Sequence, residues 1–443
     1  MTLMRWLCWG FMGLLASPAQ AMAPIQRWTS ATGAQVYFVP APELPMLDLR
    51  LLFAAGSVND GAHPGLAALT AAMLDEGTET STADEFHAAV EATGASMAAG
   101  AALETASVSL RTLSDPPTRD AALGLMQTLL AAPRFEPQAF ARQQALLLTG
   151  LKQETESPGT QADQLFMRTL YAAHPYGVPP EGTVAGVSSL TLPMVKAFYD
   201  QFYVAHNAIL ILVGDLDRPG AERLAEALTR QLKPGKPAPP VPAVVAQPAR
   251  QSHLEFDSEQ THLIVGQIAI PRGHPDHFAL VLGNHVLGGN GVVSRLFGEV
   301  REKRGLSYAV ESHFEPLAQP GPFVASLQTR GEQRDEAVTL LKGEIARFVT
   351  EGPTAAELED ARRNLLGGFP LRIDNNAKIL ENLSMIAFYK LPLDYLDTWR
   401  DNLAAVTLAE VKAAVQRHLK PDAMSVITVG RGTAAPATQT APP

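Results

Sequence analysis

Cysteine is almost absent from this sequence of 443 residues, because the only one is Cys8, close to the N-terminus. Stability must therefore come from a packed core and not from disulfides, even in an oxidising compartment. Charged residues make up only 18% of the chain and aromatic residues 7%, whereas hydrophobic residues reach 46%. These proportions are typical of a well-packed globular protein.

Long apolar runs are missing beyond the N-terminal segment, so the sequence predicts no later membrane span. The formal net charge of −10 argues against nucleic-acid binding, which needs a basic surface. The same charge weakly favours neutral or basic partners, although a solvated acidic surface is its commoner explanation.

The first 21 residues have the features of an export signal. Arg5 provides the positive charge, residues 6–15 are apolar, and Ala19, Gln20 and Ala21 form a small-residue cleavage site. The apolar stretch is short for a membrane span, and no lipobox precedes Cys8. We therefore expect cleavage after Ala21, with no membrane or lipid anchor. The mature protein is expected to be exported to a periplasm or to the cell exterior, and the periplasm is the favoured location.

The remaining length is enough for two or more domains. Proline and alanine dominate residues 232–251, which predicts an extended, semi-rigid linker between domains at 22–231 and 252–432. Residues 433–443 have a similar composition and are expected to form a flexible tail.

The segments on the two sides of the linker follow the same plan at nearly the same spacing. Each contains a strand, a polar turn, a helical stretch, a long helix after a proline turn, and a final apolar strand that runs to glycine. The matched pairs are residues 108–112 and 325–329, 121–126 and 337–341, 136–153 and 354–367, and 208–214 and 424–430. This duplication predicts two copies of one α+β domain, each with a largely antiparallel sheet that is covered by helices on one face. Residues 34–39 and 46–53 form a strand-turn-strand run within the first copy.

Residues 65–78 read Gly-Leu-Ala-Ala-Leu-Thr-Ala-Ala-Met-Leu-Asp-Glu-Gly-Thr. This stretch resembles the zinc helix of pitrilysin/insulinase-type metallopeptidases, which carries an inverted H-x-x-E-H motif. Three further segments resemble landmarks of that family in the same order, at residues 49–57, 206–215 and 294–308. The resemblance spans nearly the whole mature chain. It implies two homologous domains arranged as a clam-like half chamber.

The positions that hold zinc in this family lack donors here. The resemblance places the two histidines at Ala68 and Ala72, the catalytic glutamate at Ala71, and the third ligand at Gly150. A catalytic zinc site needs three protein ligands and a base, and alanine and glycine offer neither. We therefore expect no metal at this motif. The adjacent acidic residues Asp75 and Glu76 are interpreted as solvent-facing or helix-end charges.

The closest pair of histidines elsewhere lies in His274-Pro275-Asp276-His277. A helix-entry turn is the favoured interpretation of this segment, because the sequence offers no obvious third donor.

An arginine and a tyrosine, Arg301 and Tyr308, match a pair that contacts the substrate carbonyl in active family members. Such a pair stabilises negative charge on the oxygen of a tetrahedral intermediate. The composition alone favours a plainer interpretation. The basic residues of this segment would then be ordinary charges on a helix face, with Glu299 and Glu302 as partners, and Tyr308 would pack in the core.

The resemblance to the small bacterial branch of the family implies a non-catalytic subunit. The partner would be a homologous subunit that bears the zinc motif and supplies Zn²⁺ and the activated water, and the pair would act on unfolded peptides. The alternatives are a structural or peptide-binding protein with no role in proteolysis, and an autonomous peptidase with a relocated metal site.

Overall fold

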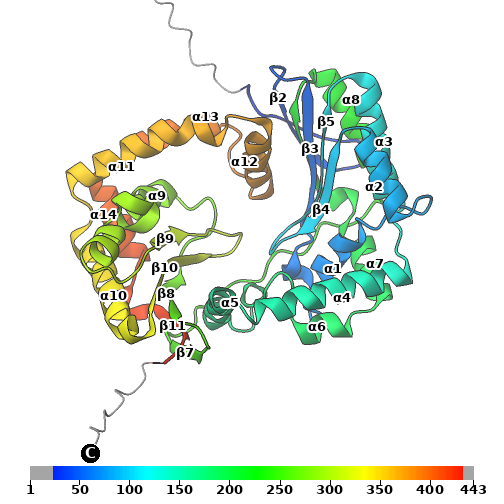
Figure 1. Ribbon diagram of the computed structural model, residues 1–443. Helices are drawn as coiled ribbons and strands as arrows, with labels where there is room; N and C mark the ends of the chain where they lie inside the picture. The colour runs from blue at the N-terminus through cyan, green and yellow to red at the C-terminus, as the bar shows by residue number, and fades with distance from the viewer. Residues whose placement is uncertain (1–22, 433–443) are drawn as a thin grey trace, which may run out of the picture.

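The computed structural model describes residues 23–432 (Figure 1). The predicted export signal and the predicted tail from residue 433 lie outside these residues. None of the helices within residues 23–432 combines the length and the apolar character that a membrane crossing requires.

The chain forms two α+β halves, each built on one mixed but mostly antiparallel sheet. The strand order is β1-β2-β6-β3-β5-β4 in the first sheet and β7-β11-β8-β10-β9 in the second. Only the pairs β2–β6 and β7–β11 are parallel. From β2 and β7 onward the two orders match strand by strand, which confirms the predicted duplication. The strands are β1 (Gln26–Thr29), β2 (Gln35–Pro40), β3 (Met46–Phe53), β4 (Ser96–Ala101), β5 (Ala106–Leu113), β6 (Ala208–Gly214), β7 (Gln251–Glu255), β8 (Gln260–Ile268), β9 (Val310–Phe314), β10 (Pro322–Arg330) and β11 (Ser425–Gly430).

The predicted strand-turn-strand run of the first half is present as β2 and β3, but the two strands are not neighbours in the sheet. Strand β6 returns from far along the chain and pairs with both. The long-range pairing fills the middle of the sheet with the apolar strand 208–214, every residue of which is at least half-buried.

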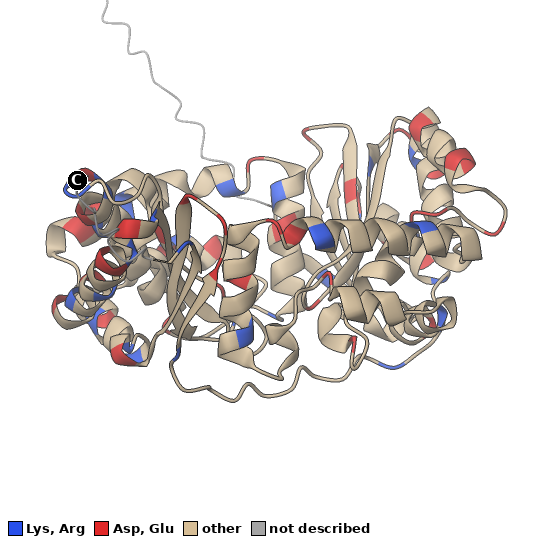
Figure 2. Ribbon diagram, turned by 60° about the horizontal axis from the view of Figure 1, so that its bottom comes forward, with Lys and Arg blue, Asp and Glu red and all other residues tan. Residues whose placement is uncertain are grey.

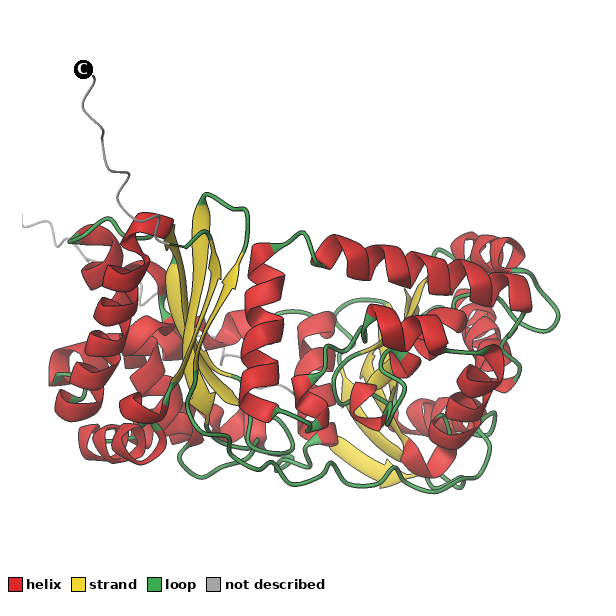
Figure 3. Ribbon diagram, turned by 90° about the horizontal axis from the view of Figure 1, so that it is seen from below, coloured by secondary structure: helices red, strands yellow, loops and turns green. Residues whose placement is uncertain are grey.

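Helices cover the outer side of each sheet (Figure 3). Several begin at a side-chain cap that satisfies their first N–H groups, as Thr354 and Glu357 do in a reciprocal capping box. The helices are α1 (Leu66–Met73), α2 (Ala83–Ala92), α3 (Pro116–Ala131), α4 (Pro137–Glu154), α5 (Pro158–Tyr171), α6 (Val184–Ser189), α7 (Leu192–Phe202), α8 (Arg218–Thr229), α9 (His277–Asn284), α10 (Arg334–Glu351), α11 (Ala355–Gly368), α12 (Asn376–Phe388), α13 (Tyr395–Ala405) and α14 (Leu408–His418).

The two halves exchange helices. Helix α5 of the first half packs on β8 and β11 of the second sheet, and α12 of the second half packs on β3 and β6 of the first (Figure 1). The Phe166 ring of α5 lies over Gly266, where a built Cβ would come 2.6 Å from the ring. Helices therefore cover both faces of each sheet, whereas the sequence predicted one covered face.

The segment between α8 and β7 has no helix or strand from residue 234 to residue 250. It runs along the outside of the molecule, with charged residues only toward its ends (Figure 2). Two hydrogen bonds fix its middle, from Gln319 Nε2 to the carbonyl of Val241 (3.3 Å) and between His174 Nε2 and the carbonyl of Pro242 (2.9 Å). The segment is thus attached to both halves.

Candidate functional site

The helix that carries the incomplete zinc motif is α1. Gly65 precedes it with φ of +96°, a backbone conformation that favours glycine. The buried Asp60 carboxylate accepts the N–H groups of Gly65 (2.7 Å) and Ala67 (2.8 Å), which would otherwise have no partner at the helix start. Burial raises the pKa of Asp60 to about 6, although these hydrogen bonds oppose the increase.

The four predicted metal positions lie on α1 and on α4, which packs against it. Ala71 is buried, whereas Ala68, Ala72 and Gly150 are partly exposed. A Cβ built on Gly150 meets no atom within 4 Å, so that position has room for a side chain but carries none. These residues do not fit a zinc ion, because no donor atom extends from any of them.

Glu76 lies just beyond the end of α1, as one of the two interpretations had it, but it is buried and not solvent-facing. Only 5% of it is exposed, and its carboxylate accepts hydrogen bonds from Arg142 and Gln143 of α4. Hydrogen bonds from Arg142 and Gln143 offset the cost of burying the carboxylate. These partners come from another helix, so the sequence around Glu76 does not reveal them. Asp75 is exposed and pairs with His87 at 3.1 Å.

Arg301 and Tyr308 lie together in the second half. Arg301 belongs to a short π-helical segment at Phe297–Glu302, and Tyr308 follows it just before β9. The guanidinium carbon of Arg301 is 4.1 Å from the centre of the Tyr308 ring and 4.9 Å from that of Phe297. One Arg301 N–H group donates to the carbonyl of Tyr308 (3.1 Å). The guanidinium therefore makes a cation–π contact with each of the two rings.

The plainer interpretation of this segment holds for the neighbouring basic residues but not for Arg301 and Tyr308. Glu299 pairs with Lys303 (2.6 Å) and Arg304 (2.8 Å), and these contacts lower the pKa of Glu299 to about 2. Arg301 has no carboxylate partner among residues 23–432, and Tyr308 is 81% exposed instead of packed in the core. Both side chains thus remain available to a ligand.

The glycine-rich segment before Arg301, which contains Gly288, Gly289 and Gly291, comes close to β9. A Cβ on Gly288 would lie 2.5 Å from Ser312 Oγ and 2.7 Å from Ser312 N, so only glycine fits there. Asn284 Nδ2 also donates to the Ser312 carbonyl (2.8 Å). These contacts hold the glycine-rich segment against the edge of the second sheet, beside the Arg301–Tyr308 pair.

Arg301 and Tyr308 line a cavity of about 750 Å³, and the exchanged helix α5 contributes Asp163 to its wall. Glu311 and His313 of β9 line this cavity and also a neighbouring one of about 580 Å³. Burial raises the pKa of Asp163, against a lowering by His313. None of the four degenerate metal positions lines either cavity.

The segment with the closest histidine pair forms the expected helix-entry turn. His274 Nδ1 accepts the N–H of Asp276 (3.1 Å), and α9 begins at His277. Burial lowers the pKa of His277 to about 4. The His277 Nε2 atom lies 3.4 Å from the Tyr395 hydroxyl.

Similarity to known proteins extends over almost the whole chain. The family described as "Insulinase (Peptidase family M16)" matches residues 41–183, and "Peptidase M16 inactive domain" matches residues 189–365. The chain is 27% identical to a non-peptidase homolog of Helicobacter pylori, over 92% of this chain and 93% of the relative. It is 26% identical to an uncharacterized zinc protease of Mycobacterium tuberculosis, over 91% and 92%.

A solved structure shares both the fold and much of the sequence. The crystal structure of a peptidase M16 inactive domain from Pseudomonas fluorescens is 40% identical, with a TM-score of 0.89, over 92% of this chain and 98% of that chain. A protease from Helicobacter pylori shares the fold at 19% identity, with a TM-score of 0.83, over 93% of this chain and 100% of that one.

Proposed function

Because this chain belongs to the peptidase M16 family and has no donor at the positions of the family's metal motif, we propose that it is the non-catalytic subunit of an exported heterodimeric zinc metallopeptidase. Its partner is a homologous subunit with an intact motif. That partner supplies Zn²⁺ and the water that attacks the peptide bond. This chain supplies Arg301, Tyr308 and part of the chamber wall for an unfolded peptide.

The observation that supports this role is the availability of Arg301 beside a cavity. A guanidinium has five N–H donors, and a single one is used by an acceptor within residues 23–432, the Tyr308 carbonyl. The cation–π contacts with Phe297 and Tyr308 restrain the guanidinium without neutralising its charge. Arg295, by contrast, pairs with the Glu357 carboxylate at 2.7 Å, which neutralises its charge.

The chemistry follows from the charge that develops during hydrolysis. When water attacks a peptide carbonyl, the oxygen becomes negative in the tetrahedral intermediate. Arg301 and the Tyr308 hydroxyl donate hydrogen bonds to that oxygen. Because the guanidinium is already positioned before the reaction, its donors stabilise the negative charge without further rearrangement, and the activation barrier falls. The four degenerate positions take no part, because alanine and glycine can neither bind a metal nor accept a proton.

The test is hydrolysis of an unfolded peptide by this chain co-expressed with a homologue that has the intact motif. We expect a stable complex whose kcat falls by about 100-fold or more in Arg301→Ala, the effect of losing one donor to the oxyanion. Arg301→Lys is expected to recover little, because an ammonium cannot reproduce the planar fork. Arg304→Ala is the matched control, since Arg304 pairs with Glu299 (2.8 Å) on the same segment.

Two results would contradict the proposal. If this chain forms no complex with any homologue encoded nearby, the proposed partner subunit does not exist. Unchanged kcat in both Arg301→Ala and Tyr308→Phe complexes would instead favour a structural or peptide-binding protein with no role in proteolysis.

A further inference from the structure

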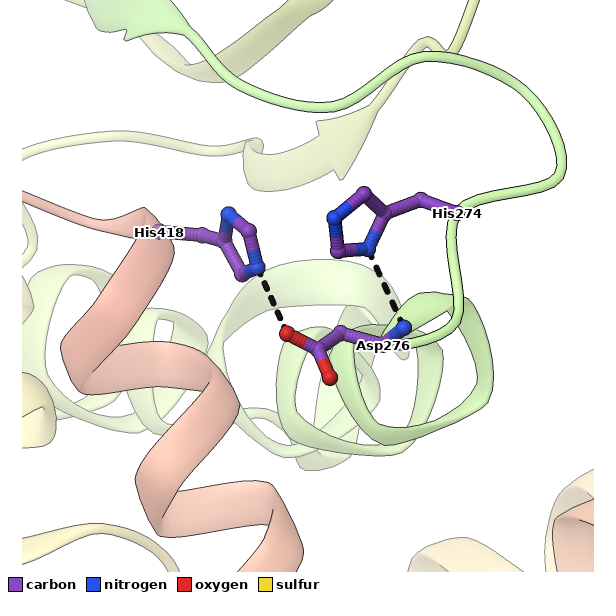
Figure 4. A group of neighbouring side chains, drawn as sticks. All are labelled: His274, Asp276 and His418. Atoms are coloured by element: carbon purple, nitrogen blue, oxygen red, sulfur yellow. Dashed lines mark hydrogen bonds and ion pairs between the residues drawn. The ribbon is translucent and has the colours of Figure 1, made fainter.

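Three possible metal donors converge where the start of α9 meets the end of α14 (Figure 4). His274 and Asp276 lie in the turn before α9, and His418 is the last residue of α14. One donor atom from each lies within 4.8 Å of the other two. Figure 4 shows both imidazole rings on the same side of the Asp276 carboxylate. The sequence brought His274 and Asp276 together but offered no obvious third donor. The fold supplies it as His418.

We propose that His274, Asp276 and His418 form a binding site for a divalent metal ion of the zinc class. Two imidazoles and one carboxylate are a donor set that such ions take, with a fourth position open to water. Hard cations such as Mg²⁺ and Ca²⁺ prefer oxygen donors, so two histidines select against them. The site is separate from the degenerate motif on α1 and α4.

The donors are already close to the geometry that a metal requires. Ligand bonds of about 2.0–2.2 Å place neighbouring donor atoms roughly 3–3.5 Å apart. His418 Nε2 and Asp276 Oδ2 are 2.7 Å apart, so this pair has only to open slightly to admit an ion. The two imidazole rings lie edge to face with their centres 4.8 Å apart. His274 has to move inward, and in doing so it gives up the hydrogen bond from the Asp276 N–H group (3.1 Å).

The backbone that carries His418 is held in place. Gln267 of β8 donates to the His418 carbonyl (2.9 Å) and accepts the N–H of Lys420 (2.7 Å). Only 13% of the His418 side chain and 20% of that of Asp276 are exposed. A partly buried, fixed pair of donors loses little freedom when an ion binds, which favours affinity.

Arg417 would compete with the ion for the Asp276 carboxylate. Its guanidinium pairs with the same Asp276 oxygen that His418 contacts, whereas no hydrogen bond within the described chain reaches Oδ1 of Asp276. The Arg417 side chain is 58% exposed, so it can turn away into solvent. A bound ion would take over its role and connect α9 to α14, and loss of the arginine would favour the ion.

The experiment is a titration of the untagged, mature chain alone with Zn²⁺, and with Co²⁺ followed by its visible absorption. We expect one ion per chain and an increase in thermal stability that grows with metal concentration. His418→Ala and His274→Ala are each expected to weaken binding by about tenfold or more. Arg417→Gln is expected to tighten it. Because the partner subunit is absent, this result is independent of the proposed function.

The matched control is His87→Ala, since His87 pairs with Asp75 (3.1 Å) and no third donor joins the two within residues 23–432. It should leave the titration unchanged. The proposal is overturned if the wild-type chain binds no ion stoichiometrically, or if binding survives unchanged in His418→Ala. If His418→Ala does not fold, the test rests on His274→Ala and Arg417→Gln. The proposal is then overturned if both variants bind the ion with the same affinity as the wild-type chain.

Discussion

Tyr389 donates a hydrogen bond of 2.6 Å to Glu104, and this bond joins the two halves of the chain. Tyr389 directly follows the exchanged helix α12, whereas Glu104 lies in the turn between β4 and β5. Glu104 is only 4% exposed, and it also accepts hydrogen bonds from the Tyr176 hydroxyl and the N–H of Ala318. A buried carboxylate with these partners fixes the β4–β5 turn against the second half.

Tyr389→Phe is expected to lower the free energy of unfolding by about 1–2 kcal/mol, because Glu104 loses one donor and keeps two. Glu104→Ala should cost more, since the buried Tyr176 hydroxyl and the part-buried Tyr389 hydroxyl then both lose their acceptor. Chemical denaturation measures both. Tyr308→Phe is the control, because its hydroxyl is exposed and should matter by less than about 0.5 kcal/mol. An equal, small effect of Tyr389→Phe and Tyr308→Phe would show that Glu104 does not need this bond.

The exchange of α5 and α12 predicts that the two halves unfold together. Leu383 of α12 packs fully buried in the core beside the first sheet, and Phe166 of α5 packs on the second. Leu383→Ala and Phe166→Ala are each expected to cost about 2–5 kcal/mol. Each variant should destabilise both halves equally, because neither sheet keeps its cover alone.

The two halves can be followed separately. After removal of residues 1–21, one tryptophan remains in each, Trp28 and Trp399. Trp28→Phe and Trp399→Phe give chains whose fluorescence reports on a single half. Two separate transitions, with only one shifted by Leu383→Ala, would disprove the coupling.

Local patterns in the sequence predicted several of the helices and strands but not their arrangement. The long helices predicted at 136–153 and 354–367 are present at Pro137–Glu154 and Ala355–Gly368. The insertion of β6 between β2 and β3 depends on pairing between strands more than 150 residues apart, as Leu52 with Ile209. The exchange of α5 and α12 depends on apolar surfaces of the opposite half. Neither relationship leaves a signal in a short window of sequence.

The candidate site also combines contacts that local sequence predicts with contacts that only the fold brings together. Arg301 and Tyr308 stand seven residues apart in one segment, so their proximity follows from local sequence. His418 meets Asp276 only because α14 packs on α9. The burial of Glu76 depends in the same way on Arg142 and Gln143 of α4. In both cases the partner of a charged group comes from another helix, and only the fold reveals it.

A substitution at Gly150, where the family's third zinc ligand would lie, tests whether the structure still requires glycine at this position. Its helix is regular, and a Cβ there meets nothing within 4 Å, so Gly150→Ala should stabilise the chain by about 0.5–1 kcal/mol. Gly56→Ala is the contrasting variant, because its Cβ would collide with the backbone of Glu104 and Thr105, and it should destabilise by about 1–3 kcal/mol. Thermal denaturation ranks the two. A destabilising Gly150→Ala would mean that the helix needs glycine for a reason that its surroundings do not show.

Glu357 predicts a specific dependence of stability on pH. Arg295 donates two hydrogen bonds of 2.7 Å to its carboxylate, and this contact lowers the pKa of Glu357 to about 2, with Thr354 adding to the effect. A carboxyl whose pKa is lower in the folded chain stabilises the fold while it is ionised. The contribution is complete above the ordinary pKa of about 4.5. It disappears as the pH falls through about 2.

Glu357→Gln should therefore lower the free energy of unfolding by about 2 kcal/mol at pH 7, because a charged hydrogen-bonded pair is lost. The difference from the wild type should be unchanged at pH 5 and smaller at pH 3, as measured by urea denaturation at each pH. Glu359→Gln is the control on the same helix, since Glu359 is largely exposed and 3.9 Å from Arg362. A difference that stays constant or grows as the pH falls would contradict the assigned pKa, because the carboxylate of Glu357 would then not be the source of the stability.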